Sequence, residues 1–217
     1  MISRMKCVKF LGMALVLAAA GLAQGADVKF RVDQKLLSYE QESEKTEANG
    51  ASNTVKTTTV DTNPLLNTEL SIYIDSCRLT YSPYGGALGF SHFFQKELEA
   101  GVVFATNSTK VDEPKNEESD MTLGVFGIYY VGMGNAEMEF DFGLTMGSSK
   151  SDNGTTKTNS KSTSIPLGFT YFRPMAENVF YGFGINYTVA NAKDSETDEK
   201  TTTNTLGIDL ASLKVTF

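Results

Sequence analysis

Cysteine is scarce in this 217-residue chain, which contains only Cys7 and Cys77. Cys7 lies in an N-terminal segment that we expect to be removed, so the mature chain would retain a single cysteine. A single cysteine excludes an intrachain disulfide. The fold must therefore obtain its stability from other interactions.

Basic residues and long apolar runs are scarce as well. Removal of residues 1–25 would take away Arg4, Lys6 and Lys9, leaving 16 basic against 26 acidic residues and a net charge of −10. Because phosphate binding needs a basic patch, nucleic acid is excluded as an expected partner. No run of 18 consecutive apolar residues follows residue 25, so the sequence predicts no transmembrane helix in the mature chain.

The first 25 residues have the three-part layout of a secretory signal peptide. A cationic start, MISRMKCVKF, precedes a 13-residue apolar stretch and the small-x-small sequence AQG. The apolar stretch is too short to span a bilayer as a mature helix. We therefore expect cleavage after Gly25 and one domain over residues 26–217. A buried core helix is the alternative interpretation of this segment.

Apolar and polar residues alternate along most of the mature chain. In MEFDFGLTM (138–146) large apolar residues occupy every second position, and in VFYGFGINYTV (179–189) the same period returns. Since successive side chains of a strand point to opposite faces, this period indicates β-strands. The sequence predicts ten strands, near 27–45, 54–74, 77–83, 87–94, 98–111, 120–131, 137–151, 158–172, 179–193 and 200–217. An alternative interpretation has eight strands and merges or discards the short pair around SPYGG (82–86).

The connections between these predicted strands fall into two classes. Short turns are expected at 95–97, 132–135 and 173–178. Longer, strongly polar connections are expected at 46–53, 112–119, 152–158 and 194–200. The two classes alternate along the chain, so one end of the structure should carry tight turns and the other long polar hairpins.

Alternation alone is compatible with a soluble β-sandwich, which buries its apolar faces. Here the polar faces of the central strands are mostly glycine and small residues. Aromatic girdles with long loops on one side and short turns on the other are typical of a transmembrane β-barrel. A closed barrel also pairs every backbone amide within the protein. We therefore predict an all-β, antiparallel up-and-down transmembrane barrel. The aromatic residues near strand ends are Tyr129, Phe169, Tyr171, Tyr181 and Tyr187.

The last strand ends LASLKVTF, with Leu213, Val215 and Phe217 in one phase. A final strand that ends on an aromatic residue resembles the assembly signal of Gram-negative outer-membrane barrel proteins. Together with the N-terminal segment, it makes the chain resemble a small outer-membrane β-barrel of the broad OmpA/OmpW-like type. The resemblance implies a bacterial outer-membrane location, contact with lipid and lipopolysaccharide, and recognition by the outer-membrane assembly machinery. Earlier apolar residues of this strand are in the opposite phase, which predicts a bulge near Ala211.

Charges of both signs occupy positions that we expect to face the lumen. A barrel of eight to ten strands has an interior only just wide enough for side chains, so these charges must pair or stay hydrated. They could form a narrow charged pore or a salt-bridged plug, and the small strand count favours the plug. The predicted lumen charges are Lys29, Arg31, Asp33, Lys35, Glu99, Glu137, Glu139, Asp141 and Asp209.

His92 is the only histidine, and it shares its phase with apolar neighbours, so we expect it on the lipid face. Ser91 would point to the opposite face, which excludes a dyad of the two on one strand. The acidic loops 112–119 and 194–200 lack the ordered spacing of a calcium loop. We therefore predict no catalytic residue, no metal and no cofactor.

Two functional classes remain open at this point. One is a structural or passively permeable outer-membrane barrel. The other is a surface-exposed binding protein or adhesin that acts through its long polar loops. The loop sequences name no ligand, so a binding partner cannot be predicted from them.

Overall fold

The computed structural model describes residues 27–48, 51–62, 68–82, 86–111, 116–152, 154 and 157–217. The expected signal peptide lies outside these residues. Within the described ranges the regular structure is entirely β-strand, joined by turns. None of the described residues forms a helix long and apolar enough to cross a membrane.

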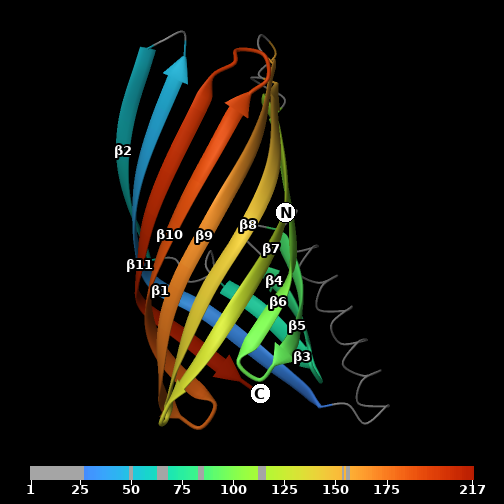
Figure 1. The fold of residues 1–217 in the computed structure, drawn as a ribbon, viewed down its shortest axis with the longest axis vertical. Coiled ribbons are helices and arrows are strands. Elements are labelled where there is room, and N and C mark those ends of the chain that lie inside the picture. The colour runs from blue at the N-terminus through green and yellow to red at the C-terminus, as the bar shows by residue number, and fades with distance from the viewer. Residues whose placement is uncertain are drawn as a thin grey trace.

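The strands form one antiparallel sheet in the order β11-β10-β9-β8-β7-β6-β5-β4-β3-β1-β2, and β1 also pairs with β11. This additional pairing closes the sheet into the barrel of Figure 1 and confirms the predicted architecture. The strands are β1 (Val28–Ala48), β2 (Ala51–Asp61), β3 (Thr68–Ile74), β4 (Cys77–Ser82), β5 (Ala87–Gln95), β6 (Leu98–Val111), β7 (Asn116–Met133), β8 (Ala136–Asp152), β9 (Lys157–Ala176), β10 (Val179–Asp194) and β11 (Lys200–Thr216).

Ten positions around the barrel hold these eleven strands, because β2 and β3 share one position. The first half of β1 pairs with β3 and the second half with β2. Between Gln34 and Ser38 β1 advances by four residues, whereas its partner advances by seven between Asp61 and Thr68. β2 and β3 are therefore two separate strands in the described part of the chain. The ten-strand prediction is confirmed, but the single strand predicted over 54–74 is wrong and is divided in two.

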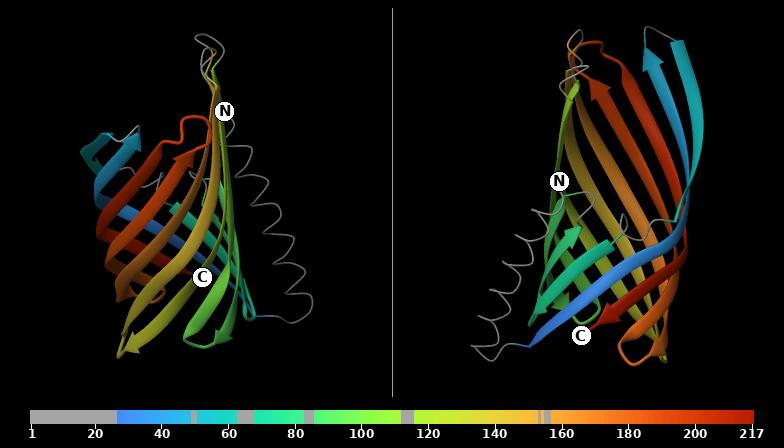
Figure 2. Two further views of the ribbon diagram at one scale, coloured as in Figure 1. Left: turned by 45° about the horizontal axis from the view of Figure 1, so that its top comes forward. Right: turned by 180° about the vertical axis from the view of Figure 1, so that it is seen from behind.

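The barrel wall is low on the side of β3, β4 and β5. These strands have seven, six and nine residues, whereas β1 has 21 and β9 has 20. At about 3.3 Å per residue, the tall strands rise far above the short ones, as the right-hand view of Figure 2 shows. The upper part of β6 beyond Ala105 pairs with β7 and has no β5 residue opposite it.

Tight turns gather at one end of the barrel, as predicted. Asp75, Gly134 and Asn178 lie in two-residue turns and have φ values of 51°, 65° and 64°. Two-residue hairpin turns of this hand need positive φ, which Gly, Asn and Asp adopt most readily. The turn at Asp75 also accounts for the change of apolar phase between β3 and β4.

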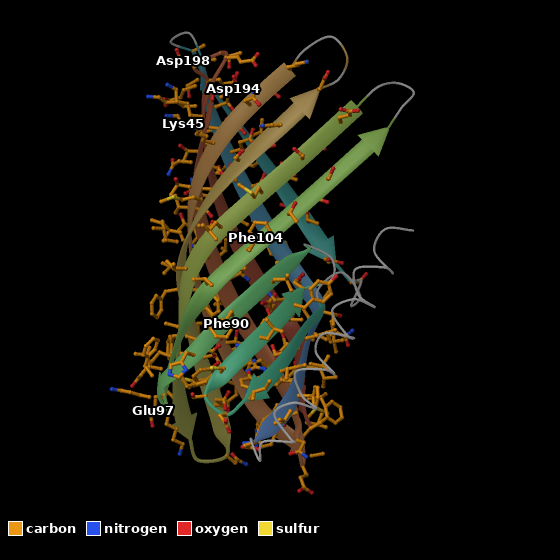
Figure 3. All side chains as sticks on the ribbon, turned by 90° about the vertical axis from the view of Figure 1, so that its right-hand side faces the viewer. Lys45, Phe90, Glu97, Phe104, Asp194 and Asp198 are labelled. Atoms are coloured by element: carbon orange, nitrogen blue, oxygen red, sulfur yellow. The ribbon has the colours of Figure 1, made fainter. Side chains whose placement is uncertain are left out.

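The opposite end carries polar hairpins that rise above the rest of the barrel. In Figure 3 Lys45, Asp194 and Asp198 lie at this end, and Glu97 lies at the tight-turn end. Asp194 accepts hydrogen bonds from the backbone N–H groups of Thr197 and Glu196. These bonds lower the pKa of the Asp194 carboxyl and hold the β10–β11 turn in shape.

Between the two polar ends, the outer surface of the barrel is a continuous apolar belt. Phe90 and Phe104 lie in it (Figure 3). On β8 the alternate residues Phe140 and Phe142 are exposed. Glu139, which precedes Phe140, is only 5 % exposed and points inward. The alternation of apolar and polar residues over 138–146 predicts this arrangement. Other exposed members are Leu88, Val102, Leu123, Val125, Tyr129, Leu144, Met146, Ile165, Leu167, Tyr181, Phe183, Ile185, Tyr187, Leu206 and Leu210.

The predicted bulge in β11 is present. Gly182 of β10 lies opposite Ser212, but Gly184 lies opposite Asp209, so β11 has one extra residue in this interval. The extra residue shifts the phase of the strand. As a result Asp209, Ser212 and Lys214 are all buried on the inner side.

Closure by the β1–β11 ladder leads to a first expected result. A barrel closed along residues 31–47 of β1 and 200–216 of β11 has no seam in this region at which detergent can open it. The folded protein should therefore run faster than the boiled protein in SDS electrophoresis, because the barrel stays compact until heated. Identical migration of heated and unheated samples of refolded protein would contradict the closed barrel.

Candidate functional site: a charged septum in the lumen

The first group of lumen side chains joins β1 and β11 to β8, and it comprises Arg31, Asp33, Glu137, Glu139 and Lys214. Arg31 Nη2 lies 3.0 Å from Glu139 Oε1, and Arg31 Nε donates to Asp33 Oδ2 at 2.6 Å. Lys214 Nζ lies 3.2 Å from Glu139 Oε1 and 2.5 Å from Glu137 Oε1. Since β1 and β8 lie on nearly opposite sides of the barrel, these contacts span the lumen.

The second group lies beside the first, on the low side of the barrel, and is centred on Arg78 and Glu99. Arg78 Nη1 donates to both oxygens of Glu99 at 3.3 Å, and Arg78 Nη2 lies 2.5 Å from Glu69 Oε1. Ser91 and Tyr130 donate hydrogen bonds to the Glu99 carboxylate. Glu99 is 0 % exposed, so Arg78 and these two hydroxyl donors stabilise its charge in place of water.

Aromatic rings connect the two groups. Arg31 Nη1 donates to the Tyr73 hydroxyl at 3.5 Å, and the Arg78 guanidinium lies 5.5 Å from the Tyr73 ring centroid. On the other side, Lys214 Nζ lies 4.3 Å from the centroid of Phe172. We call the two groups and these rings together the septum.

The septum divides the lumen into two cavities. One, of about 400 Å³, lies toward the polar hairpins and is lined by residues that include Lys35, Asp141 and Asn186. The other, of about 740 Å³, lies toward the tight turns and is lined by Lys29 and Glu97, among others. Arg31 lines both cavities, so its side chain lies at the boundary between them.

The predicted lumen charges lie at different depths. Arg31, Glu99, Glu139 and Asp209 are buried. Lys35 is partly exposed and reaches Asp209 Oδ2 at 2.8 Å. Of the remaining four, Asp33 and Asp141 line the 400 Å³ cavity, and Glu137 lines the 740 Å³ cavity. Lys29 lies exposed at the tight-turn mouth and pairs with Asp27 rather than with the septum.

Sequence reasoning missed three charged members of the septum, Glu69, Arg78 and Lys214. Lys214 lies between Leu213 and Val215, and Glu69 and Arg78 are each followed by a leucine, Leu70 and Leu79. Since neighbouring side chains of a strand point to opposite faces, the alternation implied an inward position for all three. The alternation could have placed these residues in the lumen, but it could not pair them, because their partners lie on other strands.

The residues of the predicted assembly signal lie on the closing strand. Leu213 and Val215 are partly buried, and Phe217 is 71 % exposed. The backbone N–H of Phe217 donates to the carbonyl of Phe30 at 2.8 Å, so the aromatic residue adds to the β1–β11 ladder. Their recognition by assembly machinery stays a prediction.

His92 lies on the outer face, where its ring makes an edge contact with Phe94 and its Nδ1 lies 3.3 Å from Ser76 Oγ. Ser91 points inward to Glu99, so the two residues lie on opposite faces. Within the described ranges no group of three or more His, Cys, Asp or Glu side chains is arranged to hold a metal ion.

Comparison with known proteins identifies structural rather than sequence relatives. No family model matches the chain, and no curated protein sequence matches it. Similar solved structures include OprG, an outer membrane protein from Pseudomonas aeruginosa (11 % identity, 88 % of this chain, 97 % of that chain, TM-score 0.40). They also include the outer membrane protease OmpT from Escherichia coli (9 %, 88 %, 96 %, 0.39) and the attachment invasion locus protein Ail of Yersinia pestis (13 %, 86 %, 98 %, 0.32).

The geometry of the chain itself defines its class. The sheet is closed and antiparallel, the belt of exposed apolar side chains encircles it, and the inner face is charged and hydrogen-bonded. Such a surface is stable in a bilayer and unfavourable in water. The protein is a ten-stranded transmembrane β-barrel.

Proposed function

We propose that this protein is a closed, non-conducting outer-membrane barrel with a structural role. The observation that carries the proposal is the ion pair between Arg31 and Glu139, which crosses the lumen where the two cavities meet. Both side chains are buried, and Lys214 and Asp33 satisfy their remaining groups. A hydrated ion would have to displace this network in order to pass.

The same network supports a mechanical role. Charged groups in the septum connect β1, β3, β4, β6, β8 and β11, which lie all around the barrel. Each contact is between a cation and a carboxylate in a confined space, where water screens charges less than at a surface. The septum thus acts as a cross-brace that resists deformation of the wall. The alternative role, surface binding through the polar hairpins, requires no open pore and is compatible with this closure.

Planar-bilayer recordings test the closed lumen. The parent protein should insert without conducting steps. The double variant R31A/E139A removes the side chains that separate the two cavities, and Lys214 keeps Glu137 as its partner. This variant should show discrete conducting steps, because the cavities then become continuous.

The matched control is D27A/K29A, which removes an ion pair of the same kind at the exposed mouth. It should remain silent, like the parent. A parent protein with steady conductance and a charge-dependent reversal potential would overturn the proposal and make the protein a diffusion pore.

A further inference from the structure

Three lysines lie side by side on the barrel surface at the base of the polar hairpins. In the strand ladders, Lys193 of β10 lies opposite Lys161 of β9 on one side and opposite Lys200 of β11 on the other. Residues directly opposite each other in antiparallel strands share a face, and neighbouring strands are about 4.8 Å apart. All three side chains are exposed. We call these three residues the lysine row.

The lysine row is on the outer face of the barrel, above the apolar belt. Each of its members shares the phase of an exposed apolar residue of the belt on its own strand, namely Ile165 on β9, Tyr187 on β10 and Leu206 on β11. Because every second residue of a strand points to the same face, the three lysines point away from the lumen. They therefore face the same surroundings as the belt.

The height of the lysine row matches the level of lipid headgroups. Lys161 lies four residues beyond Ile165, which is about 13 Å along the strand and about 10 Å in height for a strand tilted as in membrane barrels. The headgroup layer beyond the hydrocarbon is about 5–8 Å thick. The flexible four-carbon stem of a lysine can cover the remaining distance, so its ammonium group can reach this layer.

A row of uncharged polar residues lies between the lysine row and the belt. Asn191 of β10 lies opposite Thr163 of β9 and Thr202 of β11, and Thr202 Oγ1 donates to Asn191 Oδ1 at 3.0 Å. From the hairpins toward the belt, the surface of β9, β10 and β11 is thus first cationic, then polar without charge, then apolar. A phosphorylated lipid has the complementary order of anionic phosphate, uncharged polar groups and hydrocarbon.

Nearby carboxylates leave much of the lysine row available. Asp198 pairs with Lys193 at 2.7 Å, but both side chains are more than half exposed, so the pair is weak. Glu47 lies opposite Lys200 in the ladder, yet its carboxylate pairs with Lys45. The other two lysines of the row form no ion pair with any residue that the structure describes. Like charges directly opposite each other are unfavourable, so a bound anion would stabilise the row.

The acidic β10–β11 turn does not block access from the belt. Lys193 precedes this turn and Lys200 follows it, so the turn lies beyond the lysine row, on the side away from the belt. In Figure 3 Asp194 and Asp198 lie at this far end of the barrel. A lipid that lies along the belt therefore meets the lysines before it meets the carboxylates of the turn.

We propose that the lysine row binds the phosphate groups of a lipid in the membrane leaflet on the hairpin side. A phosphate between two adjacent lysines of the row receives charge-assisted hydrogen bonds from both. The acyl chains of the same lipid then lie on the apolar belt below. A lipid fits better than a soluble anion, because one continuous surface of β9, β10 and β11 contacts both its phosphate and its hydrocarbon.

Native mass spectrometry of the folded, detergent-solubilised barrel tests this proposal, because it counts the lipid molecules that remain bound. The probe is diphosphoryl lipid A, and its counterpart is the same lipid with the phosphates removed. The phosphorylated lipid should bind about tenfold more tightly or more, since each lysine near the headgroups attracts the phosphate. Inorganic phosphate at the same concentration should not displace it, because inorganic phosphate makes no contact with the belt.

A double variant locates the site. Lys161→Gln with Lys200→Gln removes two exposed charges without breaking an ion pair between described residues, and it should weaken binding of diphosphoryl lipid A by about thirtyfold. The matched control is Lys29→Gln with Lys96→Gln, which makes the same change of charge at the tight-turn end. This control should bind the lipid as the parent does. Heat-modifiable migration verifies that each variant is folded before the measurement.

Four results would overturn the proposal. The first is that the parent retains no diphosphoryl lipid A, and the second is that the lipid without phosphates binds equally well, which would assign binding to the belt alone. The third is displacement by inorganic phosphate, which would indicate a site for a soluble anion. The fourth is that the double variant of the lysine row binds like the parent, or that the control loses as much affinity. None of these results depends on whether the lumen conducts.

Discussion

Replacing Glu139 by glutamine is expected to lower the free energy of unfolding by about 3–5 kcal/mol, the cost of leaving a buried charge without its partner. Glu139 accepts from both Arg31 and Lys214, and all three side chains are buried. Glutamine keeps the volume but not the charge, so the expected loss is electrostatic rather than a loss of packing. Urea unfolding of the protein in lipid vesicles, monitored by tyrosine fluorescence and electrophoretic mobility, measures it.

Glu137→Gln is the matched control for this variant. Glu137 contacts the same Lys214, but its side chain is 36 % exposed, so water can replace part of the lost interaction. Its loss of stability should be well below that of Glu139→Gln. Equal effects of the two variants, or none from Glu139→Gln, would show that the lumen is hydrated and that the septum does not bear on stability.

Replacing Phe142 by arginine is expected to cost about 2–4 kcal/mol, the cost of a cation on the lipid face near the bilayer midplane. Phe142 is the middle residue of the outward-facing apolar series on β8 that runs from Met138 to Met146, and it is exposed. Its ring lies over Gly127 of β7, where a Cβ atom would meet it at 2.3 Å. The same unfolding measurement in vesicles gives the cost.

Two further substitutions separate the charge from the packing. Phe142→Leu removes the aromatic ring over Gly127 without adding charge, and its cost should be the packing share alone. Met146→Arg places the same cation at the upper edge of the belt, where the expected cost falls to about 0–1 kcal/mol. If arginine costs the same at both positions, the belt does not lie at the depth in the bilayer that its geometry indicates.

The alternation of side chains by itself predicted the strand class and the lipid face, but it left the number of strands at ten or eight, and the closed sheet decided for ten. This information is local: once a residue lies on a strand, its neighbours on the same face follow at every second position. The opposed apolar phases of the last strand even located the bulge near Ala211, because a phase change requires an extra residue. The inward positions of Arg31, Glu99 and Glu139 followed from the same rule.

Tertiary structure alone decided how far each strand extends and which charges meet. Between the β3 and β2 pairings, β1 has four residue steps, whereas the partner chain has seven. This mismatch separates β2 from β3, and it cannot be read from the sequence of one strand alone. Lys214 meets Glu139 across 75 positions of sequence, and Arg31 meets it across 108. Such contacts depend on the circumference and the register of the closed barrel. For this reason the sequence supplies the charges of the lumen, and only the closed sheet arranges them into a septum and a cavity.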